Sequence, residues 1–215
     1  MKYRTDLALE CVQMYDEDRK KKTNAEAGTD SEHKTSSEKS KGSLSDIPGV
    51  KCIEEEIDGD IKVTRIEITD ETGEALLGKK RGSYITLEID GIIDGKEGIK
   101  ERAARALADE LKNFIKFHYH LKALVIGLGN EKVTPDALGP YAVSKMKITR
   151  HLFLMYECDG DPEMANVSSF IPGVMGTTGI ETADLIKKAV EVVDPEVVII
   201  VDSLAARDIS RVNTT

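Results

Sequence analysis

The chain has 215 residues, of which 39 are acidic and 30 are basic, so its formal net charge at pH 7 is -9. That charge argues against nucleic acid as a primary ligand, because a negative protein repels the phosphate backbone. The three cysteines, Cys11, Cys52 and Cys158, form no CxxC pair, so neither a disulfide framework nor a cysteine-rich zinc site is expected. No apolar run approaches the about 18 residues of a membrane span, and we expect a soluble intracellular protein.

Residues 16–43 contain no Val, Ile, Leu, Met, Phe, Trp, Tyr or Cys, and half of them are charged. Such a segment buries too little apolar surface to offset an ordering entropy of about 1–2 kcal/mol per residue. The basic run Arg19–Lys22 is closely flanked by acids, which favours a solvated surface over a nucleic-acid patch. We therefore predict a disordered charged loop over residues 16–43.

Three segments with strand patterns follow, at residues 51–57, 61–69 and 83–89. The middle one alternates clearly but slips near Thr64, and Asp58-Gly59 and Thr72-Gly73 are turn signals between them. We expect these strands to extend the main sheet or to cover one of its edges. Apolar residues then recur at steps of three and four between Ile99 and Ile115, which predicts a long amphipathic helix.

The remaining sequence alternates between strand and helix patterns. Continuous apolar runs at residues 123–126 and 197–201 predict strands buried on both faces, and the run at 152–156 predicts a further strand. Helices are predicted between them, from about Pro135 to Lys147 and from Ile180 to Val193. This order indicates an α/β fold with a mostly parallel, doubly wound sheet flanked by helices and a β-rich N-terminal part.

Two carboxylates lie where such a sheet binds its ligands, beyond the carboxyl ends of the strands. Asp136 lies in the turn after the strand at 123–126, and Asp202 directly follows the strand at 197–201. Two carboxylates a few ångströms apart do not ionise together easily, so one can act as a base toward water while the other donates a proton. This is chemistry that peptide hydrolysis needs.

Helix capping is the alternative for both residues. Thr134-Pro135-Asp136 also has the pattern of a helix start, and Asp202 is equally suited to capping whatever follows its strand. The residues alone leave both interpretations open.

Other motifs are weaker. Gly127-x-Gly129 lacks the third glycine of a dinucleotide loop, and no GxSxG elbow of a serine hydrolase occurs. Two groups give only weak signals for metal ligands, the pair His118 and His120, and Cys158 with Asp159 and Asp161. For the histidines, a partly exposed polar helix end is the favoured interpretation. The glycine- and threonine-rich loop at residues 170–182 precedes a helix, so its backbone N–H groups can approach a ligand, or it is an ordinary turn.

Taken together, the motifs resemble the germination protease family of endospore-forming bacteria. The matching stretches are residues 3–10, Gly127–Pro140, Phe170–Thr182, Val201–Arg207 and Arg211–Thr215. The resemblance implies an aspartic-type endopeptidase with a fold like that of the hydrogenase-maturation proteases, and it places the two catalytic aspartates on Asp136 and Asp202. It implies no cofactor and no metal.

The resemblance also implies further site residues. Residues expected to bind substrate or shape the site are Gly127, Gly129, Asn130, Gly176, Thr177, Thr178, Ser203 and Arg207. The family is made as a zymogen that cleaves off its own N-terminal propeptide, and the processing region is expected at Arg4, Thr5, Asp6 and Leu7.

The expected function is hydrolysis of small acid-soluble spore proteins during germination, in the cytoplasm of the spore core. The resemblance implies a homo-oligomer, a tetramer, and the charge and hydropathy of the sequence predict no nucleic-acid or membrane partner. We expect residues 1–215 to form a single α/β peptidase domain that lacks a C-terminal portion of the family. Two alternatives remain, a metal-templated maturation protease and an incomplete fragment that only binds spore proteins.

Overall fold

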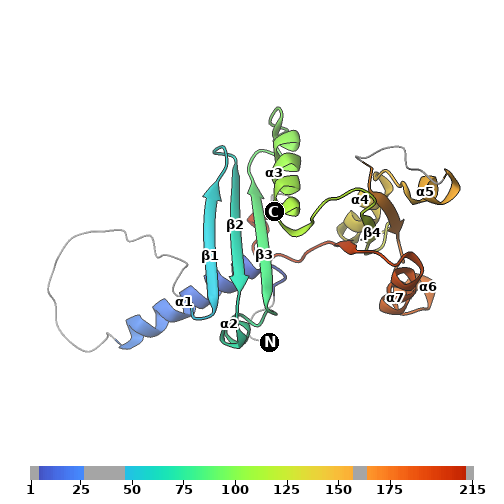
Figure 1. Cartoon of the computed structure of the whole chain (residues 1–215). Coiled ribbons are helices and arrows are strands. Elements are labelled where there is room, and N and C mark those ends of the chain that lie inside the picture. The colour runs from blue at the N-terminus through green and yellow to red at the C-terminus, as the bar shows by residue number, and fades with distance from the viewer. Residues whose placement is uncertain (1–4, 27–46, 157–163, 212–215) are drawn as a thin grey trace. The chain divides into compact units, whose positions relative to one another are not determined.

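The computed structural model describes residues 5–26, 47–156 and 164–211 (Figure 1). The chain divides into two compact units, one formed by residues 1–110 with 204–215 and the other by residues 111–203. We call them unit 1 and unit 2 and describe each by itself. In the described residues no helix is long and apolar enough to cross a membrane.

Unit 1 contains an antiparallel sheet of three strands in the order β1-β2-β3. The strands are β1 (Val50–Glu56), β2 (Ile61–Ile68) and β3 (Gly82–Ile89), so the three predicted strands are confirmed. They form a sheet of their own, however, and the expectation that they extend the parallel sheet is wrong.

Helices cover both faces of this sheet, which explains the slip in the pattern of β2. Alternate residues of a strand point to opposite faces. Ile61 and Val63 pack in a cluster with Ile99 of α3 (Ile99–Phe114), whereas Ile66 and Ile68 pack in a second cluster with α1 (Ala8–Glu26) and α2 (Glu71–Leu77). The pairing of β2 with both neighbours continues through Thr64, so the slip marks burial on both faces and not a bulge.

Two sequence predictions in unit 1 are wrong. Residues 16–26, predicted to be disordered, continue helix α1, because Glu, Lys, Arg and Ala are good helix formers that extend a helix whose first turns are buried. Residues 27–43 of the predicted loop lie outside the described residues. The turn predicted at Thr72-Gly73 lies within α2, which Asp70 caps by accepting a hydrogen bond from the backbone N–H of Gly73 at 3.0 Å.

Unit 2 contains a parallel sheet in the order β5-β4-β6, formed by β4 (Lys122–Gly127), β5 (Asn166–Phe170) and β6 (Val197–Val201). The parallel sheet is therefore confirmed, and its central strand β4 is buried on both faces as predicted. The prediction for β6 is only partly right, because Val198 and Ile200 are 39% and 52% exposed. Among the described residues β6 is an edge strand that pairs with β4 alone, and the alternate residues Val198 and Ile200 leave one of its faces partly open.

The helices of unit 2 are short except for the last. They are a 3₁₀ turn η1 (Thr134–Asp136), α4 (Leu138–Ser144), α5 (Arg150–Tyr156), α6 (Met175–Thr178) and α7 (Thr182–Val193), and a 3₁₀ turn η2 (Ile209–Arg211) lies in unit 1. The strand predicted at 152–156 is wrong, because this segment is helix α5 and leaves Leu154 and Met155 about 70% exposed. Periodicity alone does not separate strand from helix in so short an apolar run.

Candidate active site at the end of the parallel sheet

The two aspartates leave the parallel sheet at neighbouring points of one edge. Gly127, the last residue of β4, is paired with Val201, the last residue of β6. The pairing continues one residue further, since the backbone N–H of Leu128 donates to the carbonyl of Val201 at 2.8 Å. The loop that carries Asp136 therefore begins beside the residue that precedes Asp202.

The loop between β4 and α4 folds back on Asp136. The backbone N–H of Asn130 donates both to the carbonyl of Asp136 at 3.0 Å and to its carboxylate at 2.8 Å. Gly129 has φ of +114°, a region that favours glycine, and a Cβ there would lie 2.0 Å from the carbonyl oxygen of Asp136. Gly129 and Asn130 thus shape the loop and hold the Asp136 side chain, which stays half-buried.

The contacts of the two aspartates do not follow the capping alternative. The N-cap residues of α4 and η1 are Ala137 and Val133, and neither helix start receives a hydrogen bond from a capping side chain. The carboxylate of Asp202 is exposed and accepts a hydrogen bond from the backbone N–H of Ser203 at 2.8 Å. Both carboxylates thus accept hydrogen bonds from nearby backbone, and neither is fully buried.

The glycine- and threonine-rich loop follows β5, which is parallel to β4, so it starts at the same edge of the sheet. It forms the short helix α6, in which Gly176, Thr177 and Thr178 are exposed. The hydroxyls of both threonines donate to the carbonyl of Val174, at 2.9 and 3.3 Å. In this structure those hydroxyls stabilise the turn itself.

Arg207 and the predicted processing region belong to unit 1. The backbone N–H of Arg207 donates to the carboxylate of Glu10. The backbone N–H of Asp6 donates to the carbonyl of Ala205 at 3.2 Å, and the carboxylate of Asp6 accepts from the backbone N–H of Ala205 at 2.7 Å. Thr5 and Leu7 are both 7% exposed, and Lys79 donates to the carbonyls of Thr5 and Asp6 at 2.9 and 3.1 Å. In the described part of the processing region, Thr5 and Leu7 are therefore buried and Asp6 is exposed but hydrogen-bonded, whereas Arg4 lies outside the described residues.

Glu10 was missed by the sequence analysis, although it is the most connected carboxylate of this segment. It is 4% exposed and accepts hydrogen bonds from the hydroxyl of Thr5 and from the backbone N–H groups of Arg207 and Asp208. Burial by itself raises the pKa of Glu10, but these hydrogen bonds and the charge of Arg211 outweigh it, so the pKa lies below its usual value.

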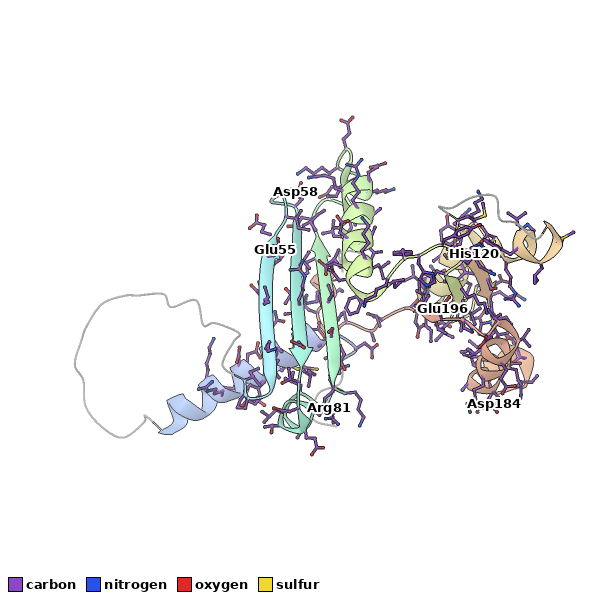
Figure 2. The ribbon with its side chains drawn as sticks, in the orientation of Figure 1. Glu55, Asp58, Arg81, His120, Asp184 and Glu196 are labelled. Atoms are coloured by element: carbon purple, nitrogen blue, oxygen red, sulfur yellow. The ribbon has the colours of Figure 1, made fainter. Side chains whose placement is uncertain are left out.

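The sequence also suggested metal ligands, and among the described residues no group of three or more His, Cys, Asp or Glu is placed to hold a metal ion. His118 lies after the end of α3 and contacts Glu196 at 3.1 Å (Glu196 is labelled in Figure 2). A hydrogen bond with the carbonyl of Tyr119 and the Glu196 carboxylate raise the pKa of His118. Cys158, Asp159 and Asp161 lie outside the described residues.

Comparison with known proteins matches the chain to one family. The sequence model described as germination protease covers residues 25–215. The germination protease of Caldanaerobacter subterraneus subsp. tengcongensis is 40% identical over 212 residues, which is 99% of this chain and 57% of that protein. The germination protease of Priestia megaterium is 47% identical over 174 residues (80% and 46%), and that of Bacillus subtilis 45% over 167 residues (76% and 45%). The chain spans about half the length of the curated relatives it matches.

Proposed function

This chain belongs to the germination protease family, and on that premise we propose that it is an endopeptidase that hydrolyses small acid-soluble spore proteins during germination. The observation that carries the proposal is the register of the parallel sheet, in which Gly127 pairs with Val201. This register supports a site in which Asp136 and Asp202 act together. Two of the stretches that resemble the family, Gly127–Pro140 and Val201–Arg207, contain these two aspartates.

The proposed mechanism uses the two aspartates as an acid and a base. The ionised carboxylate takes a proton from a water molecule, whose oxygen attacks the carbonyl carbon of the scissile peptide bond. The protonated carboxyl donates its proton to the carbonyl oxygen, which gives a tetrahedral diol. The carboxyl that took the proton from water then passes it to the leaving nitrogen as the C–N bond breaks, and a hydroxyl of the diol returns a proton to the other carboxylate, so the pair again holds one proton. The backbone N–H of Asn130 holds the Asp136 carboxylate in place for this exchange.

Substitution of each aspartate by asparagine tests the mechanism, because the amide keeps the size of the side chain but does not act as a base. In the full-length protein, Asp136→Asn and Asp202→Asn should keep the melting temperature within a few degrees and lose cleavage of a small spore protein by orders of magnitude. A helix cap predicts a different result, since asparagine caps as well as aspartate. Activity near wild type in either variant refutes the role of that residue.

We further propose that the protein is made as a zymogen processed at residues 4–7 by the same site. The buried contacts of Thr5 and Leu7 support a step in which this segment is released before it is cut. Autoprocessing should therefore fail in both asparagine variants, which is read from the N-terminal sequence of the purified protein. Cleavage that is lost with a chelator and restored by a metal ion would instead indicate a metal-templated protease.

We also propose that residues 1–215 act as one peptidase domain of the doubly wound type found in hydrogenase-maturation proteases, working in the spore core as a homotetramer. The parallel order β5-β4-β6 supports this fold class, and the oligomer and location rest on the family resemblance. Light scattering of the full-length protein measures the oligomer, and a mass corresponding to one chain contradicts the tetramer.

A further inference from the structure

Gly139, the second residue of α4, is buried where no side chain fits. A Cβ at this position would lie 2.2 Å from the carbonyl oxygen of Leu128, 2.5 Å from that of Val201 and 2.6 Å from the nitrogen of Leu128. Non-bonded heavy atoms prefer separations of about 3.5–4.0 Å. All three neighbours are backbone atoms, so even a methyl group requires the chain to move by about 1 Å.

These backbone atoms connect the two aspartates. Leu128 donates the hydrogen bond to Val201 that extends the pairing of β4 with β6. Leu128 begins the loop that leads to Asp136, and Val201 directly precedes Asp202. Gly139 therefore touches the backbone of both segments at the point where they are joined.

The contact is also tight from the side of the sheet. A Cβ at Gly127, at the end of β4, would lie 2.4 Å from the carbonyl oxygen of Gly139. Figure 1 shows α4 beside β4. The start of α4 and the end of β4 are thus in contact at two glycines, Gly139 and Gly127. The helix can lie this close to the sheet because neither residue has a side chain.

We propose that Gly139 is a positioning residue that sets the separation of the segments carrying Asp136 and Asp202. The inference rests on the proposed function. A methyl group at Gly139 presses on both carbonyls at once, so it drives the segment after β4 away from the end of β6. Because a misplacement of about 1 Å costs roughly 100-fold in rate, we expect kcat to fall by about that factor. KM should change little, because binding of an extended substrate does not depend on the distance between the two carboxylates.

The test compares Gly139→Ala with wild type and with Val143→Ala, all in the full-length protein. Val143 is buried in the same helix at 4% exposure, and its truncation loosens α4 without pressing on either loop. Two quantities are measured, kcat and KM per folded molecule on a small spore protein, and the native-state exchange rate of the Leu128 amide hydrogen. The proposal predicts faster exchange at Leu128 and a lower kcat in Gly139→Ala only.

The results separate this inference from the proposed function. If Asp136→Asn and Asp202→Asn remain active, the proposed function fails, whatever happens at Gly139. If those variants are inactive but Gly139→Ala keeps wild-type kcat or unchanged exchange at Leu128, the positioning role alone fails. A Gly139→Ala protein that does not fold, or whose activity falls only with its folded fraction, also overturns it, because the glycine then serves stability.

Discussion

Replacing Glu10 with glutamine should destabilise unit 1, although it keeps the number of heavy atoms in the side chain. The Glu10 carboxylate is buried and accepts hydrogen bonds from the backbone N–H groups of Arg207 and Asp208 at 3.0–3.2 Å. It also lies 3.6 Å from Arg211, whose side chain is 12% exposed. Glutamine keeps one acceptor oxygen, loses the charge and brings two amide hydrogens that face backbone donors.

The size of the loss in stability depends on which contacts remain in Glu10→Gln. Loss of one partner from a buried ion pair costs about 3–5 kcal/mol, and a hydrogen bond to a charged group contributes about 1.5–3 kcal/mol. Arg211 keeps a second partner, Glu88, at 2.6 Å. We therefore expect Glu10→Gln to lower the free energy of unfolding by about 2–4 kcal/mol.

The assay is urea unfolding at pH 7 with Glu17→Gln as the control, an exposed glutamate on the same helix α1. The control should lie within about 0.5 kcal/mol of wild type. If Glu10→Gln unfolds at the same urea concentration as Glu17→Gln, the contacts of Glu10 do not stabilise the fold and the reasoning is refuted.

The pH dependence of the same difference gives an independent check. The pKa of Glu10 lies below its ordinary value of 4.5, so its contribution is complete above that pH and is lost as the pH falls through the lowered folded pKa. The gap in unfolding free energy between wild type and Glu10→Gln should be constant above about pH 6 and shrink below about pH 4.5. A gap that grows on acidification contradicts the lowered pKa.

Two smaller predictions concern unit 2. The buried hydroxyl of Thr149 donates to the carbonyl of Ala165 at 2.5 Å and accepts from the N–H of Val167 at 2.8 Å. Thr149→Val should therefore lower the free energy of unfolding, measured by thermal unfolding, by about 1–3 kcal/mol. An unchanged melting temperature contradicts a stabilising role for these two hydrogen bonds. NMR titration should give His118 a pKa above its ordinary value of 6.5, and that pKa should fall in Glu196→Gln. Because the folded pKa is raised, any stability from this pair is present at low pH and is lost as the pH rises through the folded pKa. A pKa that does not fall in Glu196→Gln excludes the contribution of Glu196.

Much of the parallel sheet could be predicted because its signal is local. The run Ala123–Ile126 is apolar at every position, which is typical of a strand covered on both faces. The segment 152–156 has a similar composition but forms a helix, because a run of five residues carries too little periodicity to choose. Residues 16–26 show the opposite error, since their charge predicts disorder but their helix propensity extends α1.

The candidate site was predictable where its residues are adjacent in sequence to strand ends, as Asp202 is, or lie in a glycine-containing loop, as Asp136 does. Residues that act through distant backbone could not be found in this way. Gly139 is defined by its contact with Val201, and Glu10 by its contacts with Arg207 and Arg211, and neither contact leaves a local pattern. A glycine three residues after Asp136, inside a predicted helix, was the one available signal.

The most direct test of the paired-carboxylate mechanism is kcat/KM for wild type, Asp136→Asn, Asp202→Asn and the double variant in the full-length protein. Groups that act as one unit are not additive, so the mechanism predicts that each single variant loses about 10⁴-fold and that the double variant loses no more. If the two losses multiply in the double variant, or if either single variant cleaves a small spore protein at nearly the wild-type rate, the two aspartates do not act as a pair.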